Sequence, residues 1–152
     1  MLSSKTALVT GSTSGIGLAI AQTFAKNGAN VVINGFGDAE AIEKERAGIE
    51  KEHGVKCVYS GADMTKPDEI AAMMGEAVDT FGAIDILVNC VGIQREQKIL
   101  EVTEDSFDLM YETNLKAAMF LVTMAVPSRA SLARRRARRR RQARRERRLL
   151  CA

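Results

Sequence analysis

The stretch Thr10-Gly11-Ser12-Thr13-Ser14-Gly15-Ile16-Gly17 decides the fold. A short apolar run over residues 6–9 precedes it, and Ile16, Ile20 and Phe24 follow at helical spacing. Strand, glycine turn and helix form the setting in which a dinucleotide diphosphate binds the amides of a helix N-terminus. The spacing Gly-x-x-x-Gly-x-Gly differs from the common Gly-x-Gly-x-x-Gly. On this motif alone, a structural turn in some other α/β protein is the alternative.

The alternation of short strands and amphipathic helices continues along the chain. Further strands are predicted over residues 30–33, 56–59 and 84–88, and further helices over about 38–53, 65–82 and 103–125. Asp38 and Thr103 are predicted N-caps, and Gly54 is predicted to end the first of these helices. This order predicts parallel strands with right-handed crossovers, in a doubly wound, Rossmann-type α/β sheet. Only strands 1–4 are found where such a fold has about six, so the fourth should lie at an uncovered apolar edge. The last helix is expected to carry one apolar stripe: Phe107, Met110, Leu115, Ala118 and Val122.

The net charge of +3 is the sum of two parts of the chain with opposite charge. Residues 1–128 carry ten basic side chains against eighteen acidic ones, whereas residues 129–152 carry twelve arginines against one acid. We therefore expect the N-terminal part of a dinucleotide-binding domain over 1–128. The arginine-rich tail 129–152 should be disordered or partly helical because like charges four residues apart repel. Its composition is also typical of out-of-frame translation, and the alternative is a tail that binds nucleic acid nonspecifically.

Other classes of site find little support in the composition. The three cysteines and the single histidine show no metal-ligand spacing, so no metal is expected. Cys57 and Cys90 are predicted to be buried small hydrophobic residues. The first residues lack a signal-peptide pattern, and no apolar run reaches membrane-spanning length. We expect no membrane association and a reducing, cytoplasmic setting.

Several motifs resemble the short-chain dehydrogenase/reductase family over residues 1 to about 127. These are the Thr-Gly-x-x-x-Gly-Ile-Gly turn, Asp63, the Asn89-Cys90-Val91-Gly92 loop and Asn114, with matching order and separations. Within the family, residues 11–15, 34–38 and 92–94 look most like bacterial D-3-hydroxybutyrate dehydrogenases. The resemblance implies an oxidoreductase that transfers a hydride from D-3-hydroxybutyrate, a short hydroxy acid, to NAD, giving acetoacetate. It also implies a homo-oligomer for the full-length protein.

The resemblance implies a role for each matching residue. The cofactor would be bound by Gly11, Thr13, Ser14, Gly15, Ile16, Gly17, Phe36, Asp63, Met64, Asn89 and Gly92. Asn114 would be catalytic, holding a water in the proton relay, and Gln94 would bind the substrate carboxylate. NAD is expected because Ser14 lies where NADP-preferring relatives often have a basic residue. The strand end at Gly35-Phe36 also supplies no cation for a 2′-phosphate.

Local chemistry leaves other roles open. Asp63 could cap the turn before the next helix, and Asn114 could be a back-bonded or solvent-facing helix residue. Phe36 could be a packing residue and Gln94 a solvated loop side chain. Cys90 replaces the second Asn of the family's usual Asn-Asn-Ala-Gly loop, a departure that could weaken cofactor binding.

One catalytic element of the family is missing from the sequence. The family uses a Ser and a Tyr-x-x-x-Lys pair, in which the Tyr is the general acid/base and the Lys lowers its pKa. The residues four positions after Tyr59 and Tyr111 are Asp63 and Leu115. The expectation is therefore a chain truncated after its fourth strand–helix unit, which binds the cofactor but is inactive alone.

Overall fold

A computed structural model describes residues 2–125, so the predicted boundary at 128 and the tail 129–152 lie outside the described residues. The strands are β1 (Thr6–Val9), β2 (Asn30–Asn34), β3 (Cys57–Ser60) and β4 (Ile86–Val88). They form one parallel sheet in the order β3-β2-β1-β4, which confirms the predicted Rossmann-type fold with strands 1–4. The helices between them are α1 (Gly15–Lys26), α2 (Ala39–His53) and α3 (Pro67–Phe81).

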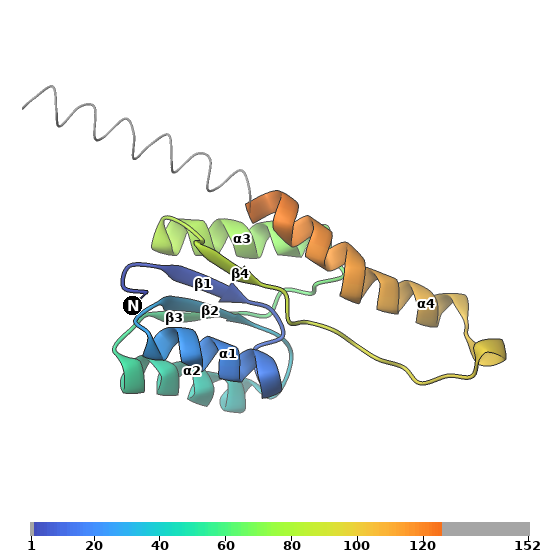
Figure 1. Cartoon of the computed structure of the whole chain (residues 1–152), viewed down its shortest axis with the longest axis horizontal. Coiled ribbons are helices and arrows are strands. Elements are labelled where there is room, and N and C mark those ends of the chain that lie inside the picture. The colour runs from blue at the N-terminus through green and yellow to red at the C-terminus, as the bar shows by residue number, and fades with distance from the viewer. Residues whose placement is uncertain (1, 126–152) are drawn as a thin grey trace, which may run out of the picture.

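The segment after β4 leads away from the sheet and returns as a long helix (Figure 1). It contains the short 3₁₀ turn η1 (Ile99–Glu101), α4 (Glu104–Tyr111) and the π-helical turn η2 (Glu112–Lys116). Residues 117–125 continue the helix. The loop and the first turns of this helix project from the body of the molecule.

The sheet lies between two helical layers (Figure 1). Helices α1 and α2 cover one face, and α3 and the helix after β4 cover the other. Alternate strand residues point to opposite faces: Val9 and Ile33 pack on the side of α1 and α2, whereas Leu8 and Val32 pack with α3 and Leu121. All four residues of β1 are buried, as expected for a central parallel strand.

The predicted helix caps at Asp38, Thr103 and Gly54 are confirmed. Asp38 accepts a hydrogen bond from the Ala41 N–H at the start of α2, and Thr103 accepts one from the Ser106 N–H at the start of α4. Gly54 ends α2 with a φ of +65°. Helix α1 differs, because Ser14 makes no side-chain capping bond within the described chain and the first turn carries no acid.

The fourth strand is shorter than predicted. It begins at Ile86 rather than at residue 84, and it lies at the edge of the described sheet. Just before the strand, the Asp85 carboxylate accepts hydrogen bonds from Lys5 Nζ at 2.8 Å and from the Thr6 N–H at 3.2 Å. The Asp85 N–H also donates to the Thr6 carbonyl at 2.9 Å, so the backbone of Asp85 stays bonded to β1 although the regular strand begins at Ile86.

The apolar stripe predicted for the last helix does not form the face that packs on the molecule. Phe107, Leu115 and Val122 are 57%, 53% and 47% exposed. The face that packs on the molecule instead consists of small or polar residues followed by one leucine: Ser106, Thr113, Ala117 and Leu121. Small side chains let a helix backbone approach its neighbours closely, and Phe107, Leu115 and Val122 point outward.

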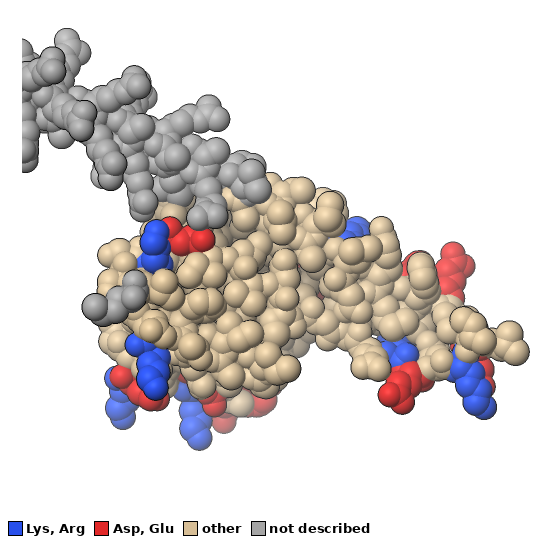
Figure 2. Space-filling view, viewed as in Figure 1, with Lys and Arg blue, Asp and Glu red and all other residues tan. Residues whose placement is uncertain are grey.

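Charged side chains lie mostly at the periphery of the face seen in Figure 2, and other residues form its centre. Within residues 2–125, no helix is long and apolar enough to cross a membrane. The same residues contain no group of three or more His, Cys, Asp or Glu that could hold a metal ion.

Candidate functional site

A cleft of about 450 Å³ lies at the carboxyl ends of the strands. In open α/β sheets, ligands bind at this edge, at the point where the strand order reverses. Here that point is β1, which pairs with β2 on one side and β4 on the other. The loops after all four strands and one side of α4 and η2 contribute to the walls. Figure 2 shows a recess between the body and the projecting segment.

The structure brings most of the predicted site residues to this cleft. Those that line it are Gly11, Thr13, Ser14, Phe36, Asp63, Met64 and Gly92. Gly15, Ile16 and Gly17 do not line it but form the first turn of α1 directly after Ser14. Asn89 and Gln94 are exposed and also lie outside the lining.

The three glycines of the turn have different surroundings. A Cβ at Gly11 would lie 2.9 Å from Val91 Cα, and one at Gly17 would collide with the Gly11 carbonyl oxygen. These two positions therefore need glycine for close packing of the turn. Gly15 has a φ of +55°, yet a Cβ there would meet no described atom within 4 Å. Gly15 leaves open space in front of the uncapped end of α1.

Thr10 positions the loop after β4 and was not predicted as a site residue. Its side chain is fully buried, and Oγ1 accepts hydrogen bonds from the Cys90 N–H at 3.1 Å and the Val91 N–H at 3.2 Å. The same hydroxyl lies 3.4 Å from the Val88 carbonyl, to which it donates. The sequence feature that could have indicated this role is the position of Thr10, a polar residue between an apolar strand and the first glycine of the turn.

Asp63 caps its own turn, as the local alternative predicted. Its Oδ1 accepts hydrogen bonds from the Thr65 N–H at 2.9 Å and the Thr65 hydroxyl at 2.8 Å. Its Oδ2 lies 3.7 Å from Lys66 Nζ. Partial burial alone would raise the pKa of Asp63, but the Thr65 hydrogen bonds and the Lys66 charge outweigh burial and lower it. The carboxylate therefore carries a negative charge at the cleft wall.

Asn114 lies within the π-helical turn η2, a type of irregularity that is frequent at functional sites. Its Oδ1 accepts a hydrogen bond from the Ile93 N–H at 2.8 Å, and its Nδ2 donates to the Ile93 carbonyl at 2.9 Å. Ile93 lines the cleft, and a Cβ at Gly92 would lie 3.4 Å from Asn114 Oδ1. Asn114 thus ties the loop after β4 to the long helix.

Asn34 is a second residue that the sequence did not single out. It is fully buried at the end of β2 and lines the cleft. Its Nδ2 donates to the Ser60 carbonyl at 3.1 Å and the Ala62 carbonyl at 3.0 Å, whereas its Oδ1 has no partner among the described residues. A buried acceptor without a partner is costly, and this one belongs to a residue in the wall of the cleft.

Comparison with known proteins identifies the family. Residues 5–137 match the family model described as short chain dehydrogenase. The chain belongs to that family. It is 47% identical over 127 residues to a D-beta-hydroxybutyrate dehydrogenase of Cupriavidus necator, an alignment that covers 84% of this chain and 48% of the relative. It is 45% identical over 123 residues to the protein of the same name from Rhizobium meliloti, with 81% and 48% covered.

A solved structure supports the same family. A short chain dehydrogenase from Burkholderia cenocepacia, in complex with NADP, matches with a TM-score of 0.79 and 35% identity. That match covers 83% of this chain and 51% of the solved chain. The chain therefore spans about half the length of the curated relatives it matches.

The residues of the cleft fit a nicotinamide dinucleotide, the type of cofactor that this family binds. The open space at Gly15 and the uncapped α1 suit a diphosphate, because helix N-termini favour anions. The orphaned Asn34 Oδ1 and the Asp63 carboxylate suit the hydrogen-bond donors of an adenosine group. The exposed ring of Phe36 provides an apolar surface at the rim.

Proposed function

We propose that this chain binds NAD in the cleft and supplies the cofactor-binding half of a D-3-hydroxybutyrate dehydrogenase. The observation that carries the proposal is the glycine turn, in which Gly11 and Gly17 pack tightly while Gly15 leaves the end of α1 open beside the cleft. The two relatives named for hydroxybutyrate support the substrate class, a short hydroxy acid.

Each wall of the cleft would hold one part of the cofactor. Main-chain amides of residues 15–17 would bind the diphosphate, while Phe36, Asp63 and Met64 would contact the adenosine. Asn89 and Gly92 would lie toward the nicotinamide ribose, with Ile16 beside the diphosphate. When bound, NAD supplies the acceptor for a hydride from the substrate carbon.

The polar residues beyond the cofactor would act on the substrate side. Gln94 would bind the substrate carboxylate through its side-chain amide. Asn114 would hold a water for proton transfer once the hydrogen bonds to Ile93 rearrange, or keep those bonds and position the loop. The sequence contains no Tyr-x-x-x-Lys, so the 152-residue chain should bind NAD without oxidising 3-hydroxybutyrate.

The preference for NAD over NADP rests on charge. A 2′-phosphate needs a nearby cation, and neither Lys nor Arg occurs among the described residues that line the cleft. Ser14 offers only a hydroxyl at the turn. The solved NADP complex is that of a relative, and the proposal for this chain rests on the residues of its own cleft.

Fluorescence titration of the 152-residue chain with NADH and with NADPH tests the proposal. We expect saturable NADH binding and clearly weaker NADPH binding, together with no turnover of 3-hydroxybutyrate. Tighter binding of NADPH would refute the cofactor assignment. If neither NADH nor NADPH binds, the proposed function is refuted. Measurable NAD-dependent oxidation would refute the claim that the acid/base pair is required.

We also propose that the protein forms a homo-oligomer through the outward face of the long helix. Five large apolar residues at helical spacing are about half exposed on it: Phe107, Tyr111, Leu115, Met119 and Val122. An apolar stripe of this kind usually marks an interaction site. Sedimentation of the parent and of Leu115→Glu should show assembly of the first and its loss in the second; identical sedimentation as a monomer would contradict the proposal.

The free thiols of Cys57 and Cys90 are compatible with a reducing, cytoplasmic setting.

A further inference from the structure

The loop after β2 is held by two hydroxyl groups that come from opposite sides. Thr13 Oγ1 donates a hydrogen bond to the Phe36 carbonyl at 2.9 Å. Tyr59 Oη donates to the neighbouring Gly35 carbonyl, also at 2.9 Å. Thr13 belongs to the glycine turn before α1, whereas Tyr59 belongs to β3. Two successive carbonyls of one loop are thus tied to the elements on either side of it.

The space around these bonds is shaped for them. A Cβ at Gly35 would lie 2.7 Å from Thr13 Oγ1, so no side chain fits at this position while the Thr13 bond is made. A Cβ at Gly61 would lie 3.0 Å from Tyr59 Oη, so Gly61 makes room for the phenol. Gly35 and Gly37 have φ values of +150° and +152°, conformations that L-residues rarely adopt. Without the two bonds, a loop with two such glycines would sample many conformations.

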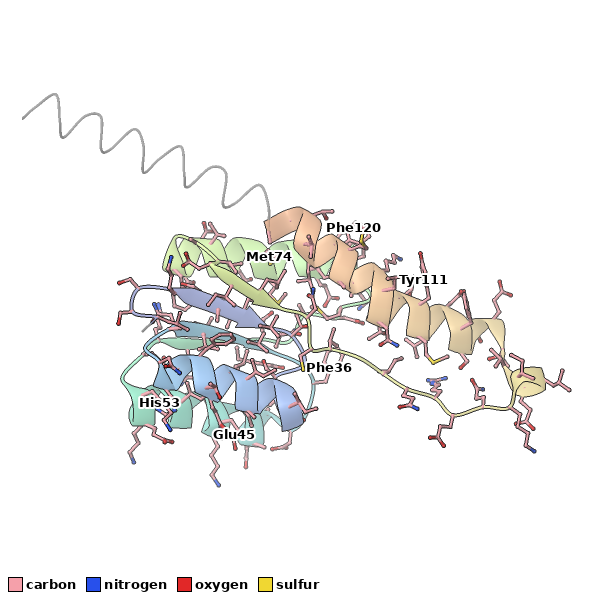
Figure 3. The ribbon with its side chains drawn as sticks, viewed as in Figure 1. Phe36, Glu45, His53, Met74, Tyr111 and Phe120 are labelled. Carbon is pink, nitrogen blue, oxygen red and sulfur yellow. The ribbon has the colours of Figure 1, made fainter. Side chains whose placement is uncertain are left out.

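The side chain carried by this loop is Phe36, which is 68% exposed and lines the cleft. In Figure 3 it lies at the ends of the strands, on the side from which the segment after β4 projects. An exposed aromatic ring at the wall of a cleft suits a planar group that can stack on it. The position of this ring follows the backbone at residues 35 and 36, which are the two residues that the hydroxyls hold.

We propose that Tyr59 is a positioning residue for the adenosine end of the cofactor. Its hydroxyl, together with that of Thr13, holds the loop in the form that presents Phe36 to the adenine ring. This inference rests on the proposed function, since it assumes that the cleft takes a dinucleotide. A loop that is ordered before binding loses less conformational entropy when the ligand arrives, so removing one tie should weaken binding of adenosine-containing ligands.

The test compares Tyr59→Phe with Tyr111→Phe in the full 152-residue chain. Each variant removes one phenolic oxygen. Tyr111 is 49% exposed, stacks on Phe107 and lies on α4 away from Phe36 (Figure 3). Tyr111→Phe keeps the aromatic ring in the apolar stripe of the long helix, which makes it a matched control. The ligands are AMP, ADP-ribose and inorganic pyrophosphate, measured by calorimetry, with thermal unfolding as a check on folding.

We expect Tyr59→Phe to bind AMP and ADP-ribose roughly five- to tenfold more weakly, as loss of one hydrogen bond predicts. Its affinity for pyrophosphate and its melting temperature should match those of Tyr111→Phe. Unchanged AMP binding in Tyr59→Phe, or an equal loss for pyrophosphate, would overturn the inference while leaving the proposed function intact. Failure of the parent chain to bind ADP-ribose would overturn the proposed function and this inference together.

Discussion

Replacing Gly15 with alanine separates cofactor binding from folding. Gly15 has a φ of +55°, and a Cβ there meets no described atom within 4 Å. The substitution should therefore cost only the strain of an alanine in the left-handed region, about 1–2 kcal/mol of unfolding free energy. The new methyl group would occupy the open space in front of α1. Loss of one charge-assisted hydrogen bond to the diphosphate would cost about 1.5–3 kcal/mol of binding free energy, or roughly 10- to 150-fold in affinity.

Gly54 provides the matched control for this substitution. It has a φ of +65°, open surroundings and a place at the end of α2. The adjacent His53 lies at the opposite end of the sheet from Phe36 (Figure 3). Urea unfolding should show similar destabilisation in Gly15→Ala and Gly54→Ala, whereas NADH titration should show weakened binding in Gly15→Ala alone. Equal NADH affinities in the two variants would refute the assignment of the diphosphate site.

Three further results are expected. Leu121→Ala should lower the unfolding free energy by about 3 kcal/mol, because this leucine is fully buried, and Leu100→Ala, at a position 96% exposed, should change it by less than about 0.5 kcal/mol; similar values in urea unfolding would contradict the packing of the long helix. Burial raises the pKa of the Cys57 thiol to about 12, so peptide mapping after alkylation at pH 8 should find Cys90 modified before Cys57, and labelling of Cys57 before Cys90 would contradict its burial. The pKa of Asp63 is lowered in the folded state, so its contribution to stability is present above the usual carboxyl pKa near 4 and is lost as the pH falls further. The stability difference between the parent and Asp63→Asn should accordingly shrink between pH 7 and pH 3, and a constant difference would contradict this account.

The sheet and its first three crossovers could be predicted because their signals are local. Apolar runs bounded by glycine turns marked the strands, and Asp38 and Gly54 marked the two ends of α2. The glycine turn also predicted that candidate residues from different strands would gather at one edge of the sheet, and Asp63 and Phe36 line the same cleft there. These inferences needed only short stretches of sequence and the rule that parallel strands end at one edge.

The orientation of the last helix could not be predicted in this way. An apolar stripe on a helix usually faces the core. Here the packed face uses small and polar residues, among them Ser106, Thr113 and Ala117. The hydrogen bond from Tyr59 to Gly35 could not be predicted either, because it joins two strand ends that come together only in the folded sheet. The bonds from Lys5 and Thr6 to the Asp85 side chain likewise join residues about 80 positions apart in the sequence. Contacts between distant segments leave no periodic pattern in the sequence.

The strand order has a consequence for how the domain assembles. β1 pairs with β2 through Ala7 and Val31, but with β4 through Ala7 and Ile86, which closes a loop roughly three times longer. By the logarithmic dependence of loop-closure entropy on length, the second pairing costs roughly 1 kcal/mol more to initiate. During synthesis, β1, β2 and β3 can associate while β4 is still being made. The side of the cleft that contains Cys90 and Gly92, together with the side formed by α4 and η2, would then be added after the rest, so the cleft would be completed only in the final stage of folding.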